Sequence, residues 1–562
     1  MKFSELEYRR PDVARIQKDY RELVERTEKA ETEEEILDIW EVHQRLGREY
    51  NLPDRTVYIR NTMNVKDEFY AGEKAYFDSV SPEYYNTMNQ LYKALLEHPK
   101  KQVLADKFGK IILEKMQVAL NAADESVIDL QREDNALVGE YDKLYASYMV
   151  DFQGKQVTLP QLAVYMMDGK DAATRRAARE TDGKWFDAHH EKLDDIFSRM
   201  IQNRNEQARR MGFRDYSELS YLRMGRIGYD MKDIENYREQ VARDIVPVAK
   251  QLMELRMKRV GIENPKLYDL DICFKDGNPE PAGNTDYMLD MCKKMYDELS
   301  PETAEFIDWM FENESFDVLT RPGKLLGAYM YNVTDYGPFV FANWNGSAFD
   351  VETITHEMGH AFQAYVGNKM GLILELVEPA METCEIHSTS MEFLTSPFHH
   401  LFFGKDTAKY QLQHAEDAML ATCYGCQVDE FQHIVYQKPE LTPAERNQIW
   451  LDLDKKYRPW IDNDGLPFYA DGGAWQKQKH IYEFPFYFID YCLARTAALQ
   501  FFALHLKDPK EAWKRYVELV KKGGGETYSD LLQQAGFRNP FGEGSMKEIA
   551  DTLATWCKEH QV

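Results

Sequence analysis

The sequence predicts a mainly α-helical protein with one small region of β structure, and three observations carry this prediction. Long stretches place apolar residues at intervals of three and four amid abundant Glu, Lys and Arg, which is the pattern of amphipathic helices. Aromatic and β-branched runs, which favour strands, are few and cluster in one place. With 31 Gly and 21 Pro in 562 residues, both types are too scarce for a disordered or fibrous chain.

The helical pattern is clearest in three segments, which span residues 11–46, 104–134 and 233–260. A chain of 562 residues is too long for one compact core, so we expect more than one domain. The turn at residues 152–156 favours a boundary shortly after it. We therefore predict an N-terminal helical domain over residues 1–170 and a second domain, which carries the motifs described below, over residues 171–562.

The β signals lie mostly between residues 325 and 345. Two aromatic and β-branched runs, residues 325–333 and 337–345, flank the turn-forming sequence TDYG. We expect Gly327 to Asn345 to form a hairpin or two neighbouring strands. Shorter extended segments are expected at residues 156–162 and 266–272.

The charge of the chain argues against two classes of partner. A formal net charge of −26 would repel nucleic acids and anionic membranes, because both are polyanions. The longest apolar stretch, residues 492–506, is interrupted by Arg495, Gln500 and His505 and is too polar to span a bilayer. We expect neither nucleic acid nor a membrane as a partner.

The cysteines and the N-terminus indicate a cytoplasmic protein. Seven scattered cysteines do not form a disulfide framework, and residues 1–13 lack the apolar core of a secretory signal. Cys423 and Cys426 form a C-x-x-C pattern, but their surroundings resemble a helix interior. We therefore expect buried structural thiols there rather than a redox pair.

The stretch ITHEMGHAFQ, residues 354–363, contains the pattern H-E-x-x-H. Asp350 is a candidate N-cap, and the pattern predicts a helix over residues 351–365. Residues four apart share one helical face, so His356 and His360 can bind the same metal ion. Glu357 lies beside them, where this motif carries the general base of metallopeptidases.

A catalytic zinc site needs a third protein ligand. A third histidine in the H-E-x-x-H-x-x-G-x-x-H arrangement is excluded, because that position is Val366. A second helix, opened by Pro379 in its first turn, offers carboxylates instead. Along one of its faces lie four polar residues: Glu382, Glu385, Thr389 and Glu392.

HEMGH, followed by VEPAMETCE and IHSTSMEFL, resembles the oligoendopeptidase F and thimet oligopeptidase group of family M3 zinc peptidases, especially the short bacterial oligoendopeptidases that include the Pz-peptidases. The resemblance covers most of residues 320–540. It implies one zinc ion per chain, with Glu385 as the third ligand beside His356 and His360. Glu382 is the reserve ligand, and His387 is expected to support the site without binding the metal.

The resemblance also implies an architecture and an activity. Two helical halves would enclose a deep substrate channel, with a small β-sheet beside the zinc helix. The implied activity is endopeptidase cleavage of short oligopeptides. Zinc would activate a water molecule, and Glu357 would take its proton and pass it to the leaving amine.

The segment DGGAWQKQKHIYEFPFYFIDYCLA, residues 471–494, supplies candidate donors for the oxygen of the tetrahedral intermediate. Pro485 can open a helix on which Tyr487 and Tyr491 share a face. The family has a comparable histidine, here His480, followed by tyrosines that contact the scissile carbonyl. The spacing leaves open which tyrosine is the donor; we favour Tyr491, while packing roles remain the alternative for both.

The predicted strand in front of the zinc helix is a candidate for binding an extended peptide through backbone hydrogen bonds. We assign this role to Phe341, Ala342, Asn343 and Gly346. The competing expectation is that at least two of the three aromatic residues Phe339, Phe341 and Trp344 simply pack in the interior.

Two rival functions are consistent with the same motifs. A carboxypeptidase or dipeptidase would use the same zinc chemistry but needs a fixed cation for the terminal carboxylate, and the candidates are Lys477, Lys479 and Arg495. A non-catalytic helical zinc-binding protein would have no need of Glu357 and would normally use four protein ligands. The sequence indicates neither the physiological peptide nor the oligomeric state.

Overall fold

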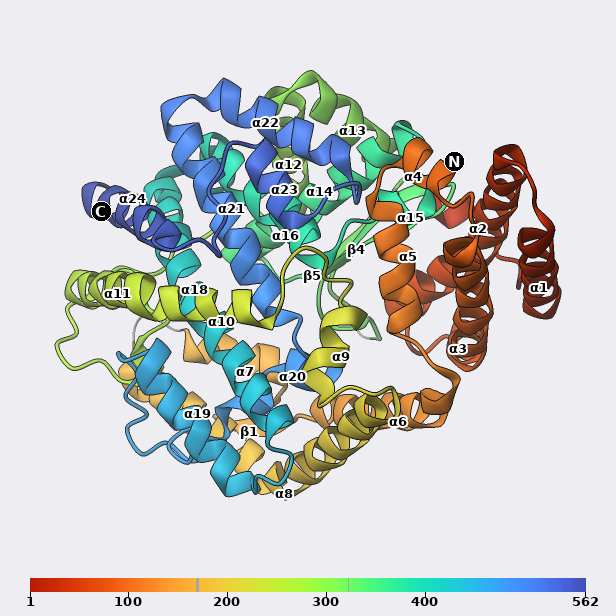
Figure 1. Cartoon of the computed structure of the whole chain (residues 1–562). Coiled ribbons are helices and arrows are strands. Elements are labelled where there is room, and N and C mark those ends of the chain that lie inside the picture. The colour runs from red at the N-terminus through yellow and green to blue at the C-terminus, as the bar shows by residue number, and fades with distance from the viewer. Residues whose placement is uncertain (168–170, 322) are drawn as a thin grey trace.

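A computed structural model of the chain describes residues 1–167, 171–321 and 323–562, and helices dominate it (Figure 1). The predicted domain boundary between residues 170 and 171 falls at residues 168–170, outside the described residues. The N-terminal helices are α1 (Val13–Lys29), α2 (Glu33–Met63), α3 (Glu68–Glu97), α4 (Gln102–Phe108) and α5 (Ile111–Asn121).

The described residues in the middle of the chain form helices, two short strands and the loops between them. The elements are α6 (Ile128–Ala146), β1 (Val150–Phe152), β2 (Lys155–Val157), α7 (Leu159–Met166), α8 (Ala172–Arg210), α9 (Tyr216–Arg223), α10 (Met231–Gln240), α11 (Val246–Val260), α12 (Thr285–Leu299) and α13 (Pro301–Glu312).

The remaining elements carry the candidate site. They are β3 (Phe316–Leu319), β4 (Tyr329–Val333), β5 (Gly337–Trp344), α14 (Ala348–Lys369), α15 (Leu374–Val377), α16 (Met381–Leu394), α17 (His399–Phe403), α18 (Thr407–Gln437), α19 (Pro443–Tyr457), α20 (Lys479–Glu483), α21 (Phe488–Lys507), α22 (Pro509–Lys522), α23 (Tyr528–Gln534) and α24 (Ser545–Glu559). None of the described helices combines the length and apolar character that crossing a bilayer requires.

Two large hydrophobic cores divide the chain. One is built by α1 to α5, around buried residues such as Trp40 and Tyr50, and its last buried member is Met116. The other begins at Leu137 in α6 and continues to Cys557. In Figure 1, α1, α2 and α3 accordingly stand on one side of the molecule and the C-terminal helices on the other. The predicted boundary at residue 170 remains a prediction, whereas the cores separate between Met116 and Leu137.

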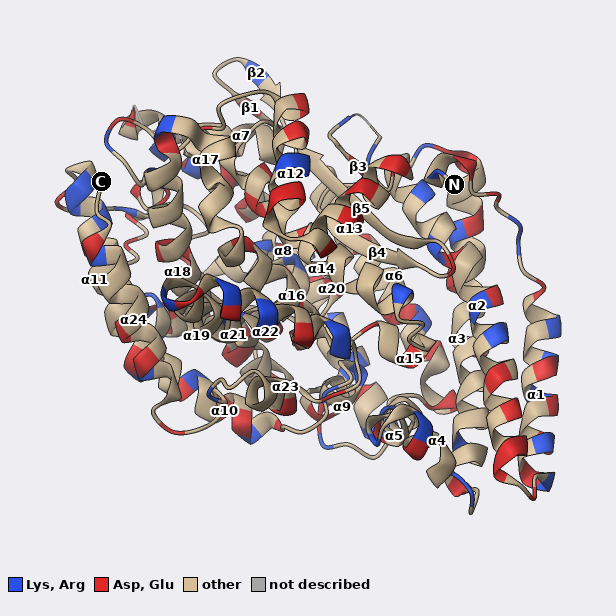
Figure 2. Cartoon of the chain, turned by 90° about the horizontal axis from the view of Figure 1, so that it is seen from above, with Lys and Arg blue, Asp and Glu red and all other residues tan. Residues whose placement is uncertain are grey.

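The charged residues of the outer helices are solvated and locally paired. Acidic and basic positions intersperse along α1, α2 and α3 (Figure 2). Pairs four residues apart, such as Arg15 with Asp19 at 2.6 Å, lie on the same helical face. Such exposed pairs contribute little stability, so the apolar faces beneath them hold these helices in place.

The sheet beside the site has the strand order β3-β5-β4. The expected hairpin is confirmed, because β4 and β5 pair antiparallel with Tyr331 opposite Phe339. The third strand, β3, was not predicted from the sequence and pairs parallel to β5 on its other side. Alternate residues of β5 face opposite ways: Phe339 and Phe341 pack with Phe3 and Ile59 of the N-terminal part, whereas Val340 and Trp344 join the larger core.

Two smaller predictions have mixed outcomes. Of residues 156–162, only Gln156 and Val157 are in a strand, and a helix follows. The prediction of an extended segment at residues 266–272 is wrong, since Leu267–Asp269 form a single 3-10 turn. The carboxylate of Asp269 accepts a hydrogen bond from the Lys266 backbone at 3.0 Å and stabilises this turn.

The C-x-x-C pattern lies inside α18, as expected. Cys423 and Cys426 are both buried free thiols. Between them, Gly425 lies where a Cβ atom would come within 2.2 Å of the Cys492 sulfur on α21. Cys423 and Cys426 therefore lie where α18 packs closely against α21.

Side chains of the N-terminal helices bind the connection between α14 and α16. Glu375 of α15 lies 2.6 Å from Nε2 of His43 and accepts a hydrogen bond from the Tyr92 hydroxyl at 3.0 Å. Gln44 donates to the other carboxylate oxygen at 2.7 Å. Because α15 joins the two helices that carry the candidate metal ligands, these bonds tie the N-terminal helices to the site.

Candidate active site

The two histidines of the H-E-x-x-H pattern project from α14. This helix extends beyond the predicted residues 351–365 at both ends, and its N-cap is Ser347 rather than Asp350. Asp350 lies inside the first turn, where its carboxylate accepts hydrogen bonds from the backbone of Asn345 and Gly346. The rings of His356 and His360 are 5.0 Å apart, centre to centre, and both are partly exposed.

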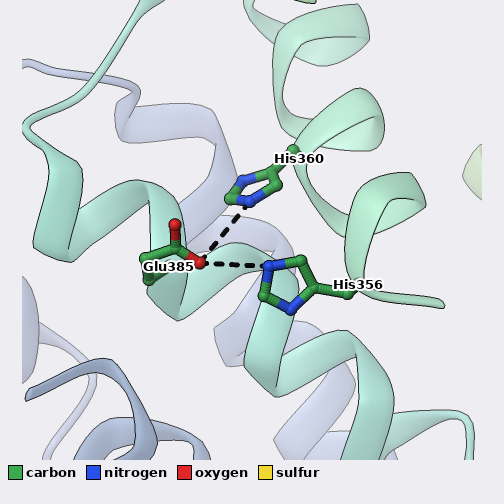
Figure 3. A group of neighbouring side chains, drawn as sticks. All are labelled: His356, His360 and Glu385. Atoms are coloured by element: carbon green, nitrogen blue, oxygen red, sulfur yellow. Dashed lines mark ion pairs between the residues drawn. The ribbon is translucent and has the colours of Figure 1, made fainter. Parts of the chain in front are cut away.

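Helix α16 brings Glu385 to these histidines (Figure 3). Its Oε2 lies 3.1 Å from Nε2 of His356 and 3.6 Å from Nε2 of His360. One donor atom from each residue lies within 4.8 Å of the other two. Burial alone would raise the pKa of Glu385, but the two imidazoles outweigh it and hold this pKa well below its usual value.

Glu382, the reserve ligand, lies outside this group. It is buried one turn earlier on α16, and burial raises its pKa to about 7, with Arg226 and Lys115 among its charged neighbours. His387 is also buried, and burial lowers its pKa to about 3. Among the described residues its Nε2 has no hydrogen-bond partner. Neither residue joins the cluster of His356, His360 and Glu385.

The glycine within HEMGH explains how α16 comes so close. A Cβ atom on Gly359 would lie 2.6 Å from the carbonyl oxygen of His387 and 2.7 Å from Cα of Ser388. Both contacts are with backbone atoms, which cannot turn aside as a flexible side chain can. The missing side chain therefore lets α14 and α16 cross with Glu385 within reach of both histidines.

Glu392, for which the sequence predicted no role, contacts His356. Glu392 of α16 places Oε1 2.7 Å from Nδ1 of His356 and Oε2 2.8 Å from Nε2 of His414 on α18. The Nδ1 contact leaves Nε2 of His356 directed at Glu385, as is usual for metal-binding histidines. Glu352, Glu392 and His414 also cluster, but both oxygens of Glu392 are already engaged. We interpret Glu392 as an orienting group.

The sequence pattern of the second helix included Glu392 but did not indicate which residue it would bond to. Glu392 stood on the polar stripe of the second helix, one turn after Thr389, yet its partner His414 lies 22 residues further along the chain. No local pattern joins them.

Glu357 is buried beside the cluster with one carboxylate oxygen, Oε2, lacking any hydrogen-bond partner among the described residues. Burial raises the pKa of its carboxyl group, while the nearby His356 and His360 oppose this shift. An unengaged carboxylate oxygen in such a place is suited to accept a proton.

The aromatic segment of α20 and α21 closes over the same carboxylate. Tyr487 donates a hydrogen bond from its hydroxyl to Glu385. The ring of Tyr491 is 5.0 Å from that of Tyr487, and the His480 ring is 5.7 Å from Tyr487 and 5.9 Å from Tyr491. The helix opens at Phe488 rather than at Pro485, so Tyr487 lies at its N-cap. The structure thus brings all three residues together.

The side chains of His480 and Tyr491 are both uncharged near neutral pH. Burial lowers the pKa of His480 to about 4, so its imidazole is neutral at physiological pH. Burial, with further contributions from Glu385 and Glu357, raises the pKa of Tyr491 well above its usual value. A neutral phenol near both carboxylates remains a hydrogen-bond donor.

The expectation of a free strand edge is wrong at Phe341, and the peptide-binding role of this segment stays a prediction. β5 is the central strand of the sheet, and Phe341 has Asp317 of β3 and Tyr329 of β4 as its register partners. Its ring stacks on Tyr329 in the interior. Pairing with β4 ends at Phe341, so Ala342, Asn343 and Gly346 lie beyond the last residue paired with β4, while Trp344 still pairs with Leu319 of β3. Phe339 and Trp344 are buried too, as the packing alternative expected.

Comparison with known proteins places this arrangement in a family. The model of the peptidase family M3 matches residues 294–551, and that of the peptidase M3 N-terminal domain matches residues 3–123. The solved structure of Pz peptidase A with an inhibitor shares 37% of residues, covers 99% of each chain and superposes with a TM-score of 0.95. The chain belongs to peptidase family M3.

More distant relatives span nearly the whole chain. Oligopeptidase PepF of Bacillus subtilis (strain 168) is 23% identical over 88% of this chain and 75% of its own length. Group B oligopeptidase PepB of Streptococcus agalactiae serotype III (strain NEM316) is 22% identical over 90% of this chain and 86% of its own. This M3 peptidase is therefore a metallo-oligopeptidase, as the motif resemblance implied.

Proposed function

We propose that this M3 peptidase is a zinc-dependent endopeptidase that cleaves internal bonds of short oligopeptides. The observation that carries the proposal is the convergence of His356, His360 and Glu385 next to Glu357, whose free carboxylate oxygen has no structural partner among the described residues. Family membership and oligopeptidase relatives support the substrate class.

The residues fit a zinc ion by the chemistry of their donors. Two imidazole nitrogens and one carboxylate oxygen form a common catalytic zinc set, which leaves a coordination position for water or substrate. His356 is held by Glu392 in the orientation that a ligand needs. When bound, one zinc ion per chain would polarise the scissile carbonyl and lower the pKa of a water molecule in the site.

Glu357 performs the proton transfers in this proposal. Its free oxygen accepts the proton of the attacking water, and the same carboxyl group then donates that proton to the nitrogen of the departing amine. The raised pKa of Glu357 favours this exchange, because a carboxyl group with a higher pKa holds the transferred proton better.

Tyr491 is our choice of donor to the developing negative charge on the carbonyl oxygen. The hydroxyl of Tyr487 is already donated to Glu385, whereas no hydrogen bond to a carboxylate engages that of Tyr491 among the described residues. His480, neutral and next to both tyrosines, is the second candidate. Preorganised donors of this kind stabilise the transition state more than the substrate.

Two observations bear on the rival functions. Of the three cations that a carboxypeptidase could use, Lys477 pairs with Asp182 and Lys479 lies 2.9 Å from Glu483, which leaves Arg495 as the one candidate without an ion pair among the described residues. The non-catalytic alternative leaves the buried free oxygen of Glu357 without purpose. We further propose a cytoplasmic setting, which the seven free cysteines support.

Peptide digestion separates these functions. We expect the zinc-loaded protein to cut a peptide blocked at both ends at an internal bond. We also expect it to leave a stably folded protein of the same composition intact, because the proposed channel between the two halves admits only short, flexible chains. Mass spectrometry identifies every product. Release of single terminal residues from unblocked peptides only, or equal cleavage of the folded protein, would contradict the proposal.

A further inference from the structure

Arg495, which has no hydrogen-bond or ion-pair partner among the described residues, lies on the face of α21 that reaches the candidate active site. On α21 the partly exposed positions of the first two turns are Tyr487, Phe488, Tyr491 and Arg495, and the residues between them are buried. Tyr487 and Tyr491 lie at the cluster of His356, His360 and Glu385. Because residues four apart share a helical face, Arg495 continues the same stripe one turn further on.

The other wall of the site contains a matching stripe. On α14, Glu352 lies one turn before His356 on the same face and is partly exposed as well. Burial raises the pKa of both Glu352 and Tyr491, and the positive charge of Arg495 opposes this shift in each, so the guanidinium of α21 lies close enough to act on Glu352 of α14. Among the described ion pairs none joins Arg495 to Glu352, whose carboxylate clusters with Glu392 and His414.

The N–H donors of the Arg495 guanidinium are available to bind a ligand. In the part of the chain that the structure describes, no hydrogen bond or ion pair engages Arg495. An arginine carries five N–H donors in a planar fork that fits a carboxylate. Lys477 and Lys479, the other cations considered above, are occupied by Asp182 and Glu483.

We propose that Arg495 forms a substrate subsite that binds a carboxylate group of the peptide close to the scissile bond. The step of four residues from Tyr491 to Arg495 is about 6 Å along the helix axis. An extended peptide advances about 3.3 Å per residue. The bound carboxylate therefore belongs to a residue within about two positions of the bond cut near Tyr491. It comes either from an acidic side chain or from the C-terminus of the substrate.

The inference rests on the proposed peptidase function, and its test uses paired peptides. One arm compares Glu with Gln at each of three positions on either side of the cut, in peptides with an amidated C-terminus. The other arm compares a free C-terminal carboxylate with its amide, in peptides without internal acids. The readout is the ratio of kcat/KM for the acidic and neutral member of each pair.

We expect the wild-type enzyme to favour the acidic member by about tenfold at one position, as for a charge-assisted hydrogen bond. Arg495→Gln should bring this ratio near one, Arg495→Lys should retain part of it, and Arg495→Glu should favour Lys there. Arg9→Gln is the matched control, because Arg9 is exposed and pairs with nearby Glu7. The responding arm identifies the source of the carboxylate.

An acidic-to-neutral ratio that is the same in the wild type and in Arg495→Gln would overturn the proposal. Binding separates this failure from failure of the proposed function. In the Glu357→Gln background, which should not turn substrate over, the dissociation constants of the paired peptides are measured by fluorescence polarisation with and without Arg495→Gln. The acidic peptide should lose about tenfold in affinity, and its neutral partner much less. A wild type that binds the acidic peptide but cuts neither peptide would instead contradict the proposed function.

Discussion

The carboxylate of Glu392 lies 2.7 Å from Nδ1 of His356, so that the other ring nitrogen, Nε2, faces Glu385 at 3.1 Å. One helix, α16, therefore supplies both the candidate ligand and the group that orients a second ligand on α14. Glu385 and Glu392 are seven residues apart, two helical turns, which puts both carboxylates on the face that meets α14.

The orienting role of Glu392 leads to a first prediction. We expect Glu392→Gln to weaken zinc binding by roughly 10- to 100-fold, because His356 loses the charged partner that fixes its ring. Competition with a chelator of known affinity measures this change. As a control, Glu548→Gln removes a similar charge from an exposed position that pairs with Arg538. Equal zinc affinity in both variants would show that Glu392 does not support His356.

The general base is tested by Glu357→Gln. We expect the variant to keep its zinc and its fold, because Glu357 is outside the candidate ligand set and one of its oxygens has no partner among the described residues. Its kcat should fall by roughly 10²-fold or more, since the amide cannot accept the proton of the attacking water. Metal analysis and single-turnover kinetics are run on the same sample. Retained turnover would remove Glu357 from the mechanism.

The two tyrosines should behave differently. Tyr491→Phe is expected to lower kcat by roughly 10²-fold with zinc affinity unchanged, as for loss of one donor to the oxyanion. Tyr487→Phe removes a hydrogen bond to Glu385 and should mainly weaken zinc binding. Comparing kcat with the zinc dissociation constant for each variant distinguishes these roles. If Tyr491→Phe turns substrate over at the wild-type rate, the donor is Tyr487 or His480.

The helix crossing at Gly359 is tested by Gly359→Ala. The added methyl group would meet backbone atoms of α16 at 2.6 and 2.7 Å, so the helices must separate. We expect a loss of roughly 1–3 kcal/mol in unfolding free energy, together with weaker zinc binding. Gly139→Ala in α6 is the matched control, because its Cβ would meet nothing within 4 Å. Denaturant titration that finds both variants equally stable would refute the close-crossing argument.

Local sequence patterns were sufficient for part of this structure. The hairpin at β4 and β5 follows from two apolar runs beside a turn, and the helix around His356 follows from its own periodicity. The candidate ligand set needed more, because the choice between Glu382 and Glu385 depends on how α16 crosses α14. The residues alone left both open, and the family resemblance pointed to Glu385.

What the sequence did not reveal depends on contacts between distant segments. β3 is only four residues long, and its pairing with β5 joins Phe316 to Val340, so no local alternation marked it. Its presence makes β5 an internal strand and removes the free edge expected at Phe341. The bond between Glu392 and His414 likewise joins α16 to α18. Asp350 shows the reverse case: a local cap signal was read correctly as a helix start but placed one turn too late.

The most direct test of the account is the zinc content of the wild type, Glu385→Ala and Glu382→Ala, each stripped, refilled and measured by mass spectrometry of the metal. We expect one zinc ion per chain in the wild type and in Glu382→Ala, and a large loss in Glu385→Ala. Full occupancy in Glu385→Ala with loss in Glu382→Ala would reassign the ligand. No stoichiometric zinc in the refilled wild type would contradict the account altogether.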